Sequence, residues 1–182
     1  MANKAKKFMQ DLCKKKDKTE VWQNHIVLVA KYSKLLAKQL GADEEIAETA
    51  AWLHDIMKIE GKKEKHHVHG AEKAGKILKD MGYSDKKIKH IQACILTHSS
   101  DTHYPPKTLE AKIVASADAL SHFDNLAGLA YVAYSLRKLS REEGRIWLLQ
   151  KFKTAWQKLC FPEARAMVKP KYEAIKELLK KI

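Results

Sequence analysis

Apolar residues recur at intervals of three and four positions along nearly the whole chain, and this spacing constrains the fold more than any other feature. The first run extends from Trp22 to Leu40 and stops at Gly41, a residue type that often ends helices. The same spacing returns in four later ranges, 46–57, 68–81, 88–98 and 113–121. No stretch of useful length alternates apolar and polar residues as a strand does, and the sequence has no internal repeat. The sequence therefore predicts an all-α fold, a compact helical bundle.

Capping signals and breakers divide these runs into separate helices. The acids after Ala42 suit a helix N-terminus, and Ser84 and Thr108 are typical N-caps. Residues 61–65 and 99–108 are expected to be polar loops. Two or three more amphipathic helices are expected from Tyr131 onward. Pro162 and Pro170 are predicted to punctuate them, and the predicted packing stripe is Ile146, Leu149, Trp156 and Leu159.

Charge divides the chain differently. The 182 residues carry a formal net charge of +13. Residues 1–20 hold seven Lys and three acids, residues 21–135 hold 15 Lys and 14 acids, and residues 136–182 hold 13 Lys and Arg and five acids. We therefore predict a basic N-terminal helix or arm (1–18), a helical core (19–130) and basic amphipathic C-terminal helices packed on it (131–182). A Lys-rich solvated helix surface explains this excess more simply than a nucleic-acid surface.

The composition also indicates where the protein works. No apolar run is long enough to span a bilayer, and the first residues contain no secretory signal, so a cytoplasmic protein with no membrane partner is expected. The three cysteines, Cys13, Cys94 and Cys160, are widely spaced, which is typical of reduced thiols.

Several polar residues stand where the helical period calls for apolar ones. They are His25, His54 with Asp55, His98 and Asp118. A single histidine in such a place is usually a hydrogen-bonded core residue, but an unpaired buried carboxylate costs several kcal/mol. Few cationic partners are near in sequence: the first Arg is Arg137. A divalent cation would satisfy acids and imidazoles that converge from separate helices, since it accepts both nitrogen and oxygen ligands.

The order of these residues resembles a known family. His25, the doublet His54-Asp55 after an apolar helix, and Asp118 in the run EAKIVASADAL resemble the H…HD…D pattern of the HD-domain metal-dependent phosphohydrolases over about residues 20–130. The resemblance implies an HD-type helical core, a divalent metal held by these four residues, and hydrolysis of a phosphate ester. The native ion would be Mn, Fe, Co, Ni, Zn or Mg.

Further positions resemble family members that hold two ions. His69, before a Gly-Ala helix start, and His98, in ILTHSS, would bind the second ion, and Asp55 would bridge the two. Lys58 stands where the HD-x-x-K variants carry a lysine near the phosphate, so Asp55 and Lys58 are the expected catalytic residues. Ser-Ser-Asp follows His98 where the cyclic-di-nucleotide phosphodiesterases have His-Glu, which disfavours that substrate.

The remaining histidines receive weaker assignments. His66 and His67 are interpreted as part of a mobile basic loop over the site, with a proton-donor role as the minority alternative, and His90 and His122 as surface residues. Asp101 and His103 either line the mouth of the site or belong to the loop.

Two function classes follow. The preferred one is a phosphohydrolase that uses a metal-activated hydroxide on a phosphate ester or anhydride of a nucleotide or similar small compound. A phosphatase, a nucleotidase and a dinucleoside polyphosphate hydrolase are not separated by the sequence. The alternative is a non-enzymatic, metal-containing protein that binds a nucleic acid or nucleotide through its basic ends.

Overall fold

All regular structure in residues 1–99 and 103–180, which this computed structural model describes, is helical. The predicted all-α fold is therefore confirmed. The elements of the first two thirds are α1 (Ala2–Lys15), α2 (Thr19–Val21), the π-helix η1 (Trp22–Ile26), α3 (Val27–Leu40), α4 (Glu44–Leu53), α5 (Ile56–Ile59), α6 (His66–Asp80), α7 (Asp85–Thr97) and α8 (Leu109–Asp124). They are followed by α9 (Leu126–Tyr131), the π-helix η2 (Val132–Leu136), α10 (Arg141–Lys158) and α11 (Pro162–Leu178).

Capping residues stand at the helix ends that the sequence predicts. Gly41 ends α3 with φ of 69°, a left-handed conformation that glycine adopts without steric cost. The Asp43 side chain accepts a hydrogen bond from the backbone N–H of Ile46 at the start of α4. Thr108 caps α8 in the same way by accepting from the N–H of Ala111. These caps fix where the helices that carry the polar residues begin and end.

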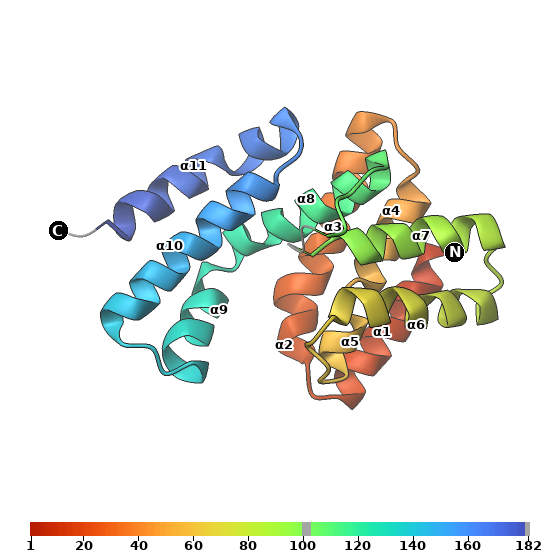
Figure 1. Ribbon diagram of the computed structural model, residues 1–182, viewed down its shortest axis with the longest axis horizontal. Coiled ribbons are helices and arrows are strands. Elements are labelled where there is room, and N and C mark those ends of the chain that lie inside the picture. The colour runs from red at the N-terminus through yellow and green to blue at the C-terminus, as the bar shows by residue number, and fades with distance from the viewer. Residues whose placement is uncertain (100–102, 181–182) are drawn as a thin grey trace.

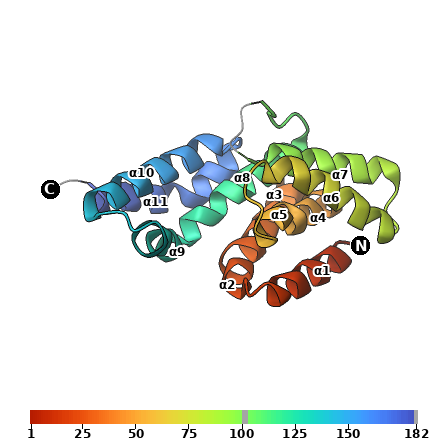
Figure 2. The same cartoon turned by 60° about the horizontal axis from the view of Figure 1, so that its bottom comes forward.

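Helix α8 is the centre of the molecule. It contacts α3, α4 and α7 on one side and α10 and α11 on the other, and it runs between these two groups in Figures 1 and 2. Its middle is buried from Ile113 to Ser121, polar residues included. A polar side chain on α8 can therefore face helices from both parts of the chain.

The N-terminal basic segment is a helix packed on the core. Ala5, Met9 and Cys13 of α1 are buried, and α1 contacts α4. Their spacing of four residues places them on one face. The lysines of α1 lie on the exposed side, where they are solvated. The predicted boundaries at residues 18 and 130 stay predictions.

Two expectations for the C-terminal helices are wrong. The buried face of α10 is formed by Leu148, Phe152 and Ala155 and continues to Leu159, whereas Ile146 is 53% exposed. Apolar residues occur on more than one side of α10, so their period does not select the core face. Pro162 starts α11 as expected, but Pro170 lies inside it. Buried Val168 and Ile175 anchor the helix to the core on both sides of the proline, which lacks a backbone N–H to donate.

No helix in the two described ranges is long and apolar enough to cross a bilayer.

Candidate metal centre

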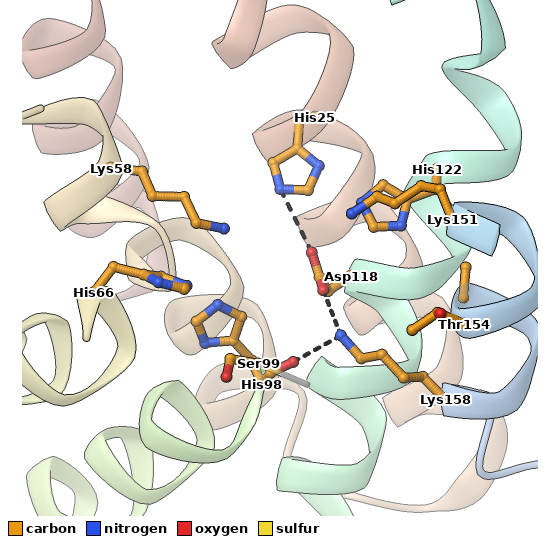
Figure 3. A pocket seen from close by; sticks show the side chains of 11 residues that line it. His25, Lys58, His66, His98, Ser99, Asp118, His122, Lys151, Thr154 and Lys158 are labelled. Atoms are coloured by element: carbon orange, nitrogen blue, oxygen red, sulfur yellow. Dashed lines mark hydrogen bonds and ion pairs between the residues drawn. The ribbon is translucent and has the colours of Figure 1, made fainter. Parts of the chain in front are cut away.

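Three helix ends, one π-helix and one helix middle bring the predicted polar residues together. Figure 3 shows three of these residues, His25, His98 and Asp118, around the pocket. His25 lies on the π-helix η1, a local widening of the helix that is frequent at functional sites. His54 and His98 are the C-terminal caps of α4 and α7, and Asp55 begins α5. Asp118 lies in the middle of α8. Residues from five elements thus meet at one point, as the sequence predicts.

The first group of ligand atoms is formed by His25, His54, Asp55 and Asp118. His25 Nε2 lies 3.1 Å from His54 Nε2, 3.4 Å from Asp55 Oδ2 and 3.5 Å from Asp118 Oδ1. His54 Nε2 lies 3.6 Å from Asp55 Oδ2 and 3.9 Å from Asp118 Oδ1. Two atoms that each lie about 2.1 Å from one ion are about 3.0 to 3.4 Å apart. The measured separations are near those of a coordination shell.

The tautomers of His25 and His54 suit a metal ion between them. His54 Nδ1 lies 2.7 Å from the Ala51 carbonyl oxygen, which only accepts, so this nitrogen carries the proton. The Ser121 hydroxyl donates to the Asp118 carbonyl and therefore accepts from His25 Nδ1 at 3.0 Å. With no proton on either Nε2, the two lone pairs face each other across 3.1 Å. This repulsion is relieved by a metal ion, for which such carbonyl and hydroxyl partners orient imidazole ligands.

A second group shares Asp55. Its other carboxylate oxygen, Oδ1, lies 3.4 Å from His98 Nε2 and 3.7 Å from His66 Nε2. His98 donates its Nδ1 proton to the Ile95 carbonyl at 2.6 Å, which leaves the Nε2 lone pair toward Asp55. His98 Nε2 is buried and makes no hydrogen bond with any residue that the structure describes. In each group of three, His25-His54-Asp55 and Asp55-His66-His98, the ligand atoms lie within 4.8 Å of one another.

His66, rather than His69, completes this second group. The His69 side chain is 52% exposed and lies 3.8 Å from Glu72, away from the cluster. Lys65 takes a left-handed backbone conformation and α6 begins at His66, so the first residue of the helix faces Asp55. The structure therefore does not bring His69 to the other predicted ligands.

Burial keeps the His54 and His66 imidazoles neutral, and nearby charges keep the two carboxylates ionised. Burial lowers the pKa of His54 to about 3 and that of His66 to about 4. Burial alone would raise the pKa of Asp55, but His54 and Lys58 outweigh it and hold this pKa well below its usual range. Lys158 similarly outweighs burial at Asp118. Neutral imidazole and ionised carboxylate are the forms that bind metals.

Two lysines pair with the two carboxylates. Lys58 Nζ lies 2.9 Å from Asp55 Oδ1, which places the predicted catalytic lysine at the cluster. Lys158 of α10 donates to Asp118 Oδ2 at 2.8 Å and to the His98 carbonyl at 2.9 Å. The C-terminal helices are therefore joined directly to the candidate metal ligands.

The cluster opens into a cavity of about 320 Å³. His122, expected at the surface, lines this cavity and stacks on His25 with ring centroids 5.9 Å apart. It follows Asp118 by four residues, so the helical period alone would have placed both on one face. His90 is the surface residue expected, in an ion pair with Glu110. His67 is buried against Tyr104, and His103 lines a different cavity; Asp101 lies outside the described residues.

The protein-family model of the HD domain matches residues 22–122, more than half of the chain. The chain belongs to the HD-domain family. The match includes His25, the His54-Asp55 doublet, His66, His98 and Asp118, and it ends before α10. The part of the chain that matches the HD-domain hydrolase superfamily therefore contains the candidate ligands but not α10, the helix that supplies Lys158.

Curated proteins with different names are similar in sequence to this HD-domain chain. It is 32% identical over 154 residues to the tRNA (cytidine(56)-2'-O)-methyltransferase of Thermoplasma volcanium, which covers 78% of this chain and 44% of that protein. It is 35% identical over 109 residues to ribonuclease Y of Alkaliphilus metalliredigens, covering 58% of this chain and 21% of that protein. The chain thus spans less than half the length of these two curated relatives.

Two solved structures share the fold of the HD-domain chain over almost its full length. Bacillus subtilis YpgQ in complex with ADP has a TM-score of 0.73 and 17% identity, with 98% of this chain and 94% of that chain covered. An HD-superfamily hydrolase from Bacillus thuringiensis has a TM-score of 0.75 and 20% identity, with 98% and 92% covered. The likeness extends over α9 to α11, beyond the matched HD domain.

Proposed function

We propose that this HD-domain protein is a metal-dependent phosphohydrolase that acts on a nucleotide or a similar small phosphorylated compound. The observation that carries the proposal is the position of Asp55. Its Oδ2 faces His25 and His54, and its Oδ1 faces His98 and His66. A carboxylate shared in this way suits two neighbouring divalent ions, an arrangement used for displacement at phosphorus.

The chain offers two sets of ligands. His25, His54, Asp55 and Asp118 would hold one ion, and Asp55, His66 and His98 would hold another. Divalent ions bound there would acidify a water nucleophile and neutralise the phosphoryl oxygens. Nitrogen and oxygen ligands suit Mn, Fe, Co, Ni, Zn or, less well, Mg. The candidate second ligand set differs from the one that the sequence suggests by the exchange of His69 for His66.

Lys58 supplies a fixed positive charge beside these ligands. Burial opposes protonation of its amine, but Asp55 and Asp118 outweigh burial and raise the pKa of Lys58, so it stays protonated. Lys58 also lines the cavity, on the side opposite α10 (Figure 3). From this position its ammonium can stabilise negative charge that develops on a phosphoryl oxygen.

Two observations support a small nucleotide-like substrate. The cavity of about 320 Å³ admits a compact ligand rather than a duplex nucleic acid. YpgQ, which shares the fold, was solved in complex with ADP.

The test is a hydrolysis screen. Wild-type protein loaded in turn with each candidate metal is incubated with an aryl phosphate and a panel of nucleotides, and released phosphate and pyrophosphate are measured separately. We expect hydrolysis of at least one compound and a loss of several hundredfold or more in Asp55→Asn, which removes a ligand charge from both sets. Hydrolysis by Asp55→Asn at the wild-type rate, or none by the wild type with any metal, refutes the proposal.

Two observations favour the alternative of a nucleic-acid-binding protein. A matching relative is named a tRNA methyltransferase, and the C-terminal segment of this chain is basic. In that alternative the metal is structural and the basic helices bind RNA phosphates.

A further inference from the structure

One wall of the cavity comes from α10, outside the matched HD domain. Lys151, Thr154, Ala155 and Lys158 line the cavity, and their spacing of three and four residues places them on one face of the helix. Figure 3 shows Lys151, Thr154 and Lys158 on the side of the cavity opposite Lys58, with Lys151 beside His122. The neighbouring face of α10 is buried through Phe152, so this wall is fixed to the core.

The charges in the cavity are not balanced. Lys58 pairs with Asp55 and Lys158 pairs with Asp118. Lys151 is the third lysine that lines the cavity, and it makes no hydrogen bond or ion pair with the residues that the structure describes, 1–99 and 103–180. Divalent ions at the candidate centre would add further positive charge. The cavity therefore carries an excess of positive charge that an anion would neutralise.

The environment of Lys151 is also unfavourable for a free ammonium group. Its side chain is half-buried, and burial lowers its pKa, although Asp118 opposes this effect. A lysine whose charge is partly removed from water gains more from an anionic ligand than an exposed lysine does. Lysine binds phosphate as a point charge, so a single Nζ–oxygen contact is enough and no bidentate geometry is needed.

We propose that Lys151 binds a phosphate oxygen of the substrate and that α10 is consequently a substrate-recognition element of this protein. The inference rests on the proposed function and deepens it, since it adds a residue from outside the matched domain to the site. The ligand chemistry is a phosphate group with two negative charges. Thr154 lies one turn further along the same face, where its hydroxyl can contact the same ligand.

The test measures binding of inorganic phosphate by isothermal titration calorimetry to Mn²⁺-loaded protein. We expect Lys151→Gln to weaken phosphate binding about tenfold, because one charge-assisted contact is lost. Lys151→Arg keeps the charge and should restore most of the affinity. Lys153→Gln is the matched control, since Lys153 is exposed on the same helix and does not line this cavity, and its affinity should equal that of the wild type.

The bound metal of each variant is measured by elemental analysis, so that a loss of ions is not read as a loss of the lysine contact. Equal phosphate affinity in wild type and Lys151→Gln overturns the inference, as does a wild type that binds no phosphate. Weaker binding in Lys151→Gln without any detectable hydrolysis supports the role of Lys151 and refutes the hydrolase. Hydrolysis by the wild type, together with equal phosphate affinity in wild type and Lys151→Gln, supports the hydrolase and refutes the role of Lys151.

Discussion

Removal of Lys158 should destabilise the metal-free protein far more than removal of another lysine from α10. Lys158 Nζ donates to Asp118 Oδ2 at 2.8 Å and to the His98 carbonyl at 2.9 Å. Its side chain is 16% exposed and that of Asp118 is 11% exposed. Lys158→Met keeps most of the aliphatic side chain but leaves the Asp118 carboxylate without its cationic partner.

The magnitude follows from those two contacts. Each of these two hydrogen bonds involves a charged group and contributes about 1.5 to 3 kcal/mol, and the residual exposure of Lys158 places both near the lower end, so the combined loss is about 3 kcal/mol. For a chain of this size, 1 kcal/mol corresponds to about 2 to 4 °C in Tm, so Tm should fall by about 6 to 12 °C. A divalent ion beside Asp118 would replace the lost charge. The difference in Tm should therefore shrink when Mn²⁺ is added.

The assay is differential scanning calorimetry with and without Mn²⁺. Lys153→Met is the control, because Lys153 is exposed on the same helix. A metal-free Lys158→Met protein that melts at the wild-type temperature, or a difference in Tm that Mn²⁺ leaves unchanged, would refute this stabilising role of Lys158.

Three further predictions concern the ligands and the alternative function. His66→Ala should lower the Mn²⁺ content of the purified protein while His69→Ala should not, and equal effects in elemental analysis would contradict the assignment of His66. Burial lowers the pKa of His54 to about 3, of His66 to about 4 and of His122 to about 3, so each stays neutral in the metal-free fold below pH 6.5 while the unfolded chain takes up protons. Stability against urea should therefore fall between about pH 6.5 and 4, by at most about 1.4 kcal/mol per pH unit for each imidazole, and a flat profile would count against these shifts. For the nucleic-acid alternative, RNA binding should weaken steeply with salt, and a lack of any binding at low salt removes that alternative.

The ligands of the first group could be predicted from the sequence because they violate the helical pattern. His25, His54, Asp55 and Asp118 occupy positions where the period calls for apolar residues, and the structure brings all four together. A buried carboxylate needs a partner, and this requirement does not depend on the details of packing. The helical fold follows from the same period.

The second group could not be assigned in full from the sequence. The run from His66 to His69 contains three histidines, and the choice among them depends on where α6 begins. That start is set by the left-handed Lys65, a backbone conformation that the local sequence does not specify. His122 was predictable in principle, since it lies one turn after Asp118 on the same face.

The contribution of α10 depends wholly on tertiary packing. Lys151 and Lys158 belong to a basic segment that reads as solvated surface, and the apolar residues of α10 do not select one face. The packing of α10 against α8 places these two lysines in the cavity. Long-range contacts of this kind carry no local sequence signal.

The most direct test of the shared-carboxylate centre is the metal content of dialysed, Mn²⁺-reconstituted protein. If Asp55 joins two ligand groups, the wild type should retain about two ions per chain and Asp55→Asn less than one, because the substitution weakens both groups at once. An Asp55→Asn protein that retains as many ions as the wild type, or a folded wild type that retains none, would contradict the account.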